Sequence, residues 1–184
     1  MKIIGRQLYQ NVRFCLSCGS ALELKQDREG KLRPRCPACG WIYYLNLIPA
    51  VAIVVINSNN ELLLIKRRFE PKAGLWALPS GYMEINMSPE ENAIAELQEE
   101  TGLVGEIEHC ISWHYGHSPI YHRILSIGFR VKQIDGILCA GDDALEAVFY
   151  PVDKLPPIAF QSHRKFIYME MKLPKHFLQA PVGE

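Results

Sequence analysis

GYMEINMSPEENAIAELQEETGL, residues 81–103, is the stretch that indicates the fold of this chain. It carries the signals of one capped helix. Ser88 is suited to the N-cap, the next residue is a proline at the first helical position, and an acid three residues after the cap closes a capping box. Gly102 supplies the stop signal. We therefore predict a helix that begins at Pro89 and ends at about Thr101.

At about 100° per residue, this helix has two different faces. Ile94, Leu97 and Thr101 form a side that must pack on a core. A quarter-turn or more away lie three acids, which are Glu96, Glu99 and Glu100. No Lys or Arg between Glu90 and Leu103 offsets their repulsion. A solvated acidic face is one interpretation; clustered carboxylates are also the ligands that Mg²⁺ or Mn²⁺ prefers.

Together with GLWALPSGYME at residues 74–84, the segment resembles the box of the Nudix hydrolase family, G-x5-E-x7-R-E-U-x-E-E-x-G-U, where U is bulky and apolar. Gly81 and Gly102 match its two glycines. The matching acids are Glu96, Glu99 and Glu100. Two positions depart from the pattern. Met87 occupies the position of the first Glu, and Ala95 occupies the position of the Arg.

The resemblance implies that the missing Arg orients the carboxylates and that the missing Glu supports the metal cluster or its bound water. With Met87 and Ala95 at these positions, both members of an interacting Glu–Arg pair are absent, so neither charge is left without its partner. The general base would then be one of the helix acids or an acid in a loop, and Glu84 and Glu146 are the candidates.

The resemblance also implies metal-assisted hydrolysis of a phosphoanhydride. The predicted catalytic residues are Glu96, Glu99, Glu100 and Glu84, and the first three would hold Mg²⁺ or Mn²⁺. The predicted substrate contacts are Arg67, Arg68, Trp113 and Glu146. The implied reaction releases AMP from a nucleoside diphosphate linked to another group, with ADP-ribose or FAD favoured and NADH possible. The resemblance further implies a homodimer.

Two CxxCG motifs precede this region, at residues 15–19 and 36–40. Their spacing fits a four-thiolate zinc ribbon. Disulfides are the competing interpretation, but no secretory leader is evident, and Cys110 and Cys139 stand unpaired in strand-like runs. We predict a cytoplasmic protein with a structural zinc ion. The predicted zinc ligands are Cys15, Cys18, Cys36 and Cys39.

Charge and composition leave two alternatives open. Met87 and Ala95 suit a catalytically weak or inactive module that binds ADP-ribose or a similar nucleotide. Basic residues outnumber acidic ones by eight to three in residues 1–45, which suits a ribbon-led nucleic-acid binder. That stretch lacks the interleaved aromatics of a single-strand binder, so we predict a small nucleotide as the partner. No run reaches the length of a membrane span.

The rest of the chain indicates an α/β fold. A β-branched run at residues 50–56 and a second run at 61–68 predict a hairpin. Further strands are predicted at residues 104–113, 124–133 and 147–150, and a second helix at 162–171. One central and one late helix around five or more strands indicate a mixed sheet between helices, an α/β/α sandwich like that of the Nudix family. The predicted domains are a zinc ribbon module at 1–45 and a Nudix hydrolase domain at 46–184.

Overall fold

The structure is a computed structural model that describes residue 9 and residues 11–118, 120–141 and 143–179. The chain divides into two compact units, Met1–Asn46 and Leu47–Glu184. In the described residues, no helix is both long and apolar enough to cross a bilayer.

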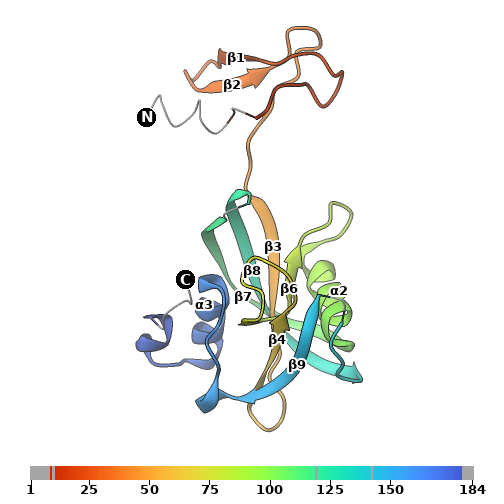
Figure 1. Ribbon diagram of the computed structural model, residues 1–184, viewed down its shortest axis with the longest axis vertical. Helices are drawn as coiled ribbons and strands as arrows, with labels where there is room; N and C mark the ends of the chain where they lie inside the picture. The colour runs from red at the N-terminus through yellow and green to blue at the C-terminus, as the bar shows by residue number, and fades with distance from the viewer. Residues whose placement is uncertain (1–8, 10, 119, 142, 180–184) are drawn as a thin grey trace. The chain divides into compact units, whose positions relative to one another are not determined.

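The N-terminal unit is built around a two-stranded antiparallel hairpin (Figure 1). Its strands are β1 (Glu23–Gln26) and β2 (Leu32–Arg35). Asp27 shapes the turn between them, because its carboxylate accepts hydrogen bonds from the backbone N–H groups of Glu29 and Lys31 at 3.0 and 2.8 Å. Short strands of this kind have little core of their own, which is consistent with a metal-supported module.

The C-terminal unit contains two sheets and two main helices. The strands are β3 (Ile48–Val54), β4 (Glu61–Arg67), β5 (Trp76–Ala77), β6 (Ser80–Tyr82), β7 (Leu103–Ser118), β8 (His122–Gly136) and β9 (Ala144–Pro151). The helices are α2 (Pro89–Thr101) and α3 (Gln161–Met171), with short 3₁₀ turns η1 (Val152–Lys154) and η2 (Lys175–Gln179). One sheet has the order β6-β3-β8-β7 and the other β5-β4-β9. The first sheet is mixed because β3 runs parallel to β8 and antiparallel to β6.

The predicted hairpin at residues 50–56 and 61–68 forms at its turn, but its two strands then separate. At the turn Ile56 pairs with Leu62, and the Leu63 N–H donates to the Val55 carbonyl at 2.9 Å; away from the turn the strands are β3 and β4, which belong to different sheets. Both edges of β3 are already taken, by β6 and by β8. The turn after β3 therefore carries the chain from one sheet to the other.

The two helices lie on opposite sides of the strands (Figure 1). Side chains alternate along a strand, and β3 uses this alternation to supply two cores. Val51 and Ile53 belong to the core beneath α2, whereas Ala52 and Val54 belong to the core beneath α3. A strand buried on both faces explains the continuous apolar run in the sequence. The predicted α/β/α sandwich and late helix are confirmed.

Helix α2 is capped as the sequence predicts. The Ser88 hydroxyl accepts from the Glu91 N–H, and the Glu91 carboxylate accepts from the Ser88 N–H. Gly102 ends the helix at φ +68°, in the left-handed region. Glu100 is buried, as are Leu97 and Thr101, so the alternative of a solvated acidic face does not hold at this position.

Candidate active site

The segment before α2 lies directly against the carboxylates of that helix. The Ser80 N–H donates to Oε2 of Glu100 at 2.8 Å. A side chain at Gly81 would collide with the Glu96 carboxylate, so glycine is needed there for close approach rather than for an unusual φ. The Ile53 N–H of β3 donates to the Pro79 carbonyl at 2.9 Å and holds the same segment on the sheet.

Burial strongly perturbs two of these acids. It raises the pKa of the half-buried Glu96 to about 7, and the charges of Glu99, Asp143 and Glu84 add to the effect. Burial also raises the pKa of Glu100 to about 8, although the Ser80 N–H and Arg67 act in the opposite direction. Each ionised carboxylate here is poorly solvated and repelled by its neighbours, which is how a site that favours a cation is arranged.

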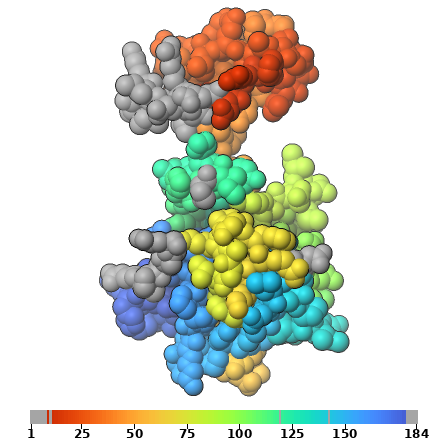
Figure 2. Space-filling model, in the orientation of Figure 1, coloured from red at the N-terminus to blue at the C-terminus, as the bar shows by residue number. Residues whose placement is uncertain are grey.

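A loop after β8 closes around the end of α2. The Cys139 and Gly141 N–H groups each donate at 3.0 Å to the last helical carbonyls, those of Thr101 and Glu100. A side chain at Gly141 would collide with the Glu99 carbonyl, so the loop can approach the end of α2 this closely only with glycine at position 141. In Figure 2 the yellow surface of the segment between β4 and β6 lies beside the cyan and blue surface of the region around β9.

This loop places Asp143, which our sequence reasoning did not select, near the helix acids. Its charge raises the pKa of both Glu96 and Glu100, and its backbone carbonyl accepts from the Arg68 N–H at 3.0 Å. The available sequence signal was an acidic pair just before a strand. Its relevance depends on the loop folding back onto α2, which the sequence pattern does not show.

Arg67 brings a positive charge to the same place. It lies at the end of β4, where the register with β9 shifts. Its Nε donates to the Pro71 carbonyl at 2.9 Å, and its guanidinium lies 5.0 Å from the centre of the Phe160 ring. Burial lowers the pKa of Arg67, while the charge of Glu100 acts against that shift. Arg67 therefore supplies a positive charge that acts on Glu100 of α2, a helix that has alanine at the arginine position of the box.

The chemistry of the acid set fits a divalent cation, since it offers hard oxygen donors whose charge is poorly compensated. The carboxylates do not form a compact cage by themselves. Across the described part of the chain, one group brings three or more ligating side chains within 4.8 Å, and it consists of cysteines. Magnesium sites commonly include waters and substrate phosphates, so an all-protein cage is not required.

That cysteine group comprises Cys15, Cys18, Cys36 and Cys39. The Sγ atoms lie 3.6 Å apart for Cys15 and Cys39, and 3.5 Å apart for Cys18 and Cys36. Tetrahedral zinc with Zn–S bonds of about 2.3 Å places sulfurs about 3.8 Å apart. Hydrogen bonds from Ser20 lower the pKa of the Cys18 thiol to about 6, which favours the thiolate that binds metal. The clustering that the sequence predicts is confirmed, and it suits structural zinc.

Comparison with known protein families agrees with this geometry. The NUDIX domain family matches residues 46–169, and the Nudix N-terminal family matches residues 13–45. This chain belongs to the Nudix family. The predictions of a Nudix-type fold, a zinc ribbon and an enzyme of the hydrolase class are thereby confirmed.

Individual Nudix relatives extend the match. The ADP-ribose pyrophosphatase of Methanocaldococcus jannaschii is 41% identical over 135 residues, which cover 71% of this chain and 79% of that protein. The NAD-capped RNA hydrolase NudC of Pseudomonas aeruginosa is 31% identical over 153 residues, covering 81% of this chain but only 51% of NudC. The crystal structure of a NUDIX hydrolase from Nitrosomonas europaea has a TM-score of 0.74 at 31% identity and covers 87% of this chain and 92% of that one.

The other predicted site residues of this Nudix chain lie in different settings. Glu84 lies in the loop before α2, and its charge contributes to the raised pKa of Glu96. Glu146 lies within β9 rather than in a loop, and its carboxylate pairs with Lys66 at 2.8 Å. The Arg68 guanidinium donates to the Ala144 carbonyl at 2.9 Å.

Trp113 lies on β7 of the Nudix unit and is 63% exposed. Lys165 of α3 donates to its carbonyl at 2.7 Å and lies 5.7 Å from the ring centre. The contacts of Trp113 thus involve α3, and its predicted role in substrate binding stays a prediction.

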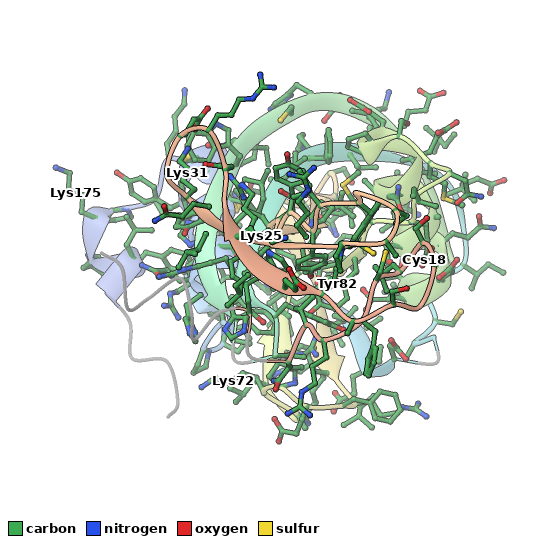
Figure 3. All side chains as sticks on the ribbon, turned by 90° about the horizontal axis from the view of Figure 1, so that it is seen from above. Cys18, Lys25, Lys31, Lys72, Tyr82 and Lys175 are labelled. Carbon is green, nitrogen blue, oxygen red and sulfur yellow. The ribbon has the colours of Figure 1, made fainter. Side chains whose placement is uncertain are left out.

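In the described part of the ribbon, three of the six basic side chains are paired with acids. Lys25 lies in β1 and Lys31 directly before β2 (Figure 3). Three ion pairs join neighbouring side chains, which are Lys25 with Glu23, Lys31 with Glu29 and Arg33 with Asp27, at 2.9, 2.7 and 3.0 Å. The Arg33 guanidinium also lies 4.6 Å from the centre of the Tyr44 ring. This pairing reduces the positive charge that a nucleic-acid backbone would meet.

Proposed function

We propose that this protein hydrolyses a nucleoside diphosphate linked to another group, in a reaction that depends on a divalent metal and releases AMP. ADP-ribose and FAD are the favoured substrates, and NADH is a further one. The observation that carries the proposal is the convergence of Glu96 and Glu100 on the Ser80–Gly81 segment, with raised pKa values, in the register of the Nudix box.

The names of the relatives support this choice. The protein from Methanocaldococcus jannaschii, which matches over most of its length, is named an ADP-ribose pyrophosphatase. The NudC relatives are named NAD-capped RNA hydrolases, but this chain spans about half of their length. We therefore favour ADP-ribose over nicotinamide substrates.

The residues of the site divide into two roles. Glu96, Glu99 and Glu100 would hold the divalent ions. When bound, Mg²⁺ or Mn²⁺ would neutralise the diphosphate and lower the pKa of a coordinated water. These three carboxylates fit that role because they offer oxygen donors without a matching set of cations.

Substrate binding and proton transfer fall to the surrounding residues. Arg67, on β4, would contact a phosphate oxygen of the substrate, and its electrostatic interaction with Glu100 supports this role. Glu84 and Asp143 both act on Glu96 electrostatically, from the two loops that flank it. Either carboxylate would accept the proton of an attacking water. Arg68, Trp113 and Glu146 remain candidate substrate contacts around this centre.

A second function is favoured by Met87 and Ala95, which replace two charged positions of the box. In that alternative the same pocket binds ADP-ribose or a similar nucleotide with little or no turnover. The acid trio and Arg67 would then serve recognition alone.

One assay separates the two functions. The protein is incubated with ADP-ribose, FAD or NADH, with Mg²⁺, Mn²⁺ or EDTA, and AMP is quantified. The proposal expects AMP release that EDTA abolishes and that ADP-ribose or FAD supports best. Calorimetric binding of ADP-ribose without AMP release under any metal condition would establish the binding module instead.

A further inference from the structure

We propose that His163 of α3 is a positioning residue for the hydrolase site, which it reaches through the strap, defined as residues 78–81. This inference rests on the proposed function, because it assigns a role in arranging the carboxylates of Glu96 and Glu100. His163 touches the strap and not the reacting groups.

His163 is fitted closely to the first residue of the strap. The imidazole is 4% exposed, and its Nδ1 accepts from the Leu78 N–H at 3.1 Å. Leu78 itself is fully buried. The Phe160 ring packs edge-on at a centroid distance of 5.0 Å and limits rotation of the imidazole. A buried N–H is nearly always paired in native proteins, so this acceptor determines where the strap can lie.

Successive residues of the strap are fastened to three different elements. Leu78 is held by α3 through His163, and the Pro79 carbonyl is held by β3. The Ser80 N–H then holds Glu100 of α2, and Gly81 lies against Glu96. Because the Pro79 ring fixes φ at that residue and restricts the backbone of Leu78 before it, a shift of Leu78 is passed on to the Ser80 N–H. The strap thus transmits the position of α3 to the carboxylates on the opposite side of the sheet.

The geometry requires a neutral imidazole. Nδ1 can accept a hydrogen bond only without a proton, so the ring proton is on Nε2. Burial lowers the pKa of His163 to about 3, and the charges of Arg67 and His114 act in the same direction. The imidazole is therefore neutral at neutral pH, and Nδ1 remains an acceptor.

Three variants test the proposal. His163→Leu keeps the bulk and removes the acceptor. His163→Asn restores an acceptor, since its Oδ1 is attached to the same side-chain position as Nδ1. Phe166→Leu is the matched control, because Phe166 is fully buried in the same helix and shares a core cluster with Leu78, but its side chain offers no hydrogen-bond acceptor to the strap.

The measurements are Mn²⁺ affinity by electron paramagnetic resonance, hydrogen exchange of the peptide spanning residues 76–82, and kcat and KM for AMP release, each corrected for folded fraction. His163→Leu is expected to weaken Mn²⁺ binding and lower kcat by about tenfold or more, as for partners that orient metal ligands, and to speed exchange at Leu78. His163→Asn should recover most of both losses. Phe166→Leu should lower the melting temperature with Mn²⁺ affinity unchanged.

The proposal is overturned if His163→Leu and Phe166→Leu change Mn²⁺ affinity and strap exchange alike, or if asparagine performs no better than leucine at position 163. These readouts do not require turnover. A wild-type protein that releases no AMP would therefore refute the proposed hydrolase while leaving the positional effect on Mn²⁺ binding measurable.

Discussion

The two metal-type sites of this protein are assembled in different ways. The four cysteines of the ribbon come from two short CxxCG motifs and place their sulfur atoms within 4.8 Å of one another. The acidic site combines side chains and backbone groups from four segments of the C-terminal unit, which are β4, the strap, α2 and the loop before β9. Its carboxylates do not reach the same compactness within the described residues.

The difference reflects what each site has to do. A structural zinc site is closed and supplies folding free energy to a unit with little core. A hydrolase site must leave coordination positions for water and phosphate, so its ligands are held by the surrounding fold and repel one another until a cation is bound. The ribbon should therefore depend on its metal for folding, whereas the Nudix unit should depend on metal for activity.

The largest expected effect is loss of the ribbon in Cys36→Ser. Cys36 is 1% exposed, and structural zinc sites of this type have apparent binding free energies of about 10–16 kcal/mol. Zinc content by atomic absorption should fall to near zero, and the amide signals of residues 13–45 should collapse. Signals of the Nudix unit should persist.

Cys110→Ser is the matched control, because this cysteine is exposed and lies on β7. It should retain a full zinc ion per chain. Retention of stoichiometric zinc by Cys36→Ser would contradict the four-thiolate site.

The next effect concerns Glu100→Gln. Replacing a ligating carboxylate is expected to lower kcat for AMP release by about 100-fold or more. The metal-free variant should nevertheless be more stable than wild type at pH 8, since it no longer carries a buried charge whose pKa is raised to about 8. Kinetics and thermal unfolding measure the two effects.

Glu90→Gln, on the exposed first turn of the same helix, should change neither quantity. A Glu100→Gln protein with wild-type kcat would remove Glu100 from the site.

At the acidic site, both folding stability and metal binding should depend on pH. Glu96 and Glu100 have folded pKa values of about 7 and about 8, above their ordinary value of 4.5. The metal-free folded state therefore retains protons that the unfolded chain releases, and its stability falls as pH rises from 4.5 through 8. Mn²⁺ binding at pH 7 should release about one to two protons. Calorimetry in buffers of different ionisation enthalpy measures this number, and binding without proton release would contradict the assignment.

The smallest expected effect is a gain of function. Met87→Glu and Ala95→Arg together should raise kcat a few-fold, and by more than the product of the single changes, because each new charge needs the other as its partner. Kinetics of the four proteins of this cycle measure the coupling. Strictly multiplicative effects would show that the two positions act independently.

Much of this protein follows from local sequence. The CxxCG spacing determines the sulfur cluster, and Ser88 and Gly102 determine the ends of α2, because knuckles and helix caps are formed by residues a few positions apart. The pattern of apolar residues likewise indicates the strands, because the face on which a side chain lies follows from its position along the strand. Pairing was only partly predictable in this way: the expected hairpin forms at its turn, but β6 and β8 occupy both edges of β3, so β4 pairs in the other sheet.

Tertiary structure alone decided the environment of the acids. Helical periodicity placed Glu100 with two other carboxylates, but only the packing of the strap buries it and pairs it with the Ser80 N–H. Asp143, Arg67 and His163 join the site from separate elements, through contacts between residues far apart in the chain. Sequence therefore determined which groups can bind metal, and the long-range packing decided which of them share one electrostatic field, because burial and charge proximity are properties of the folded chain.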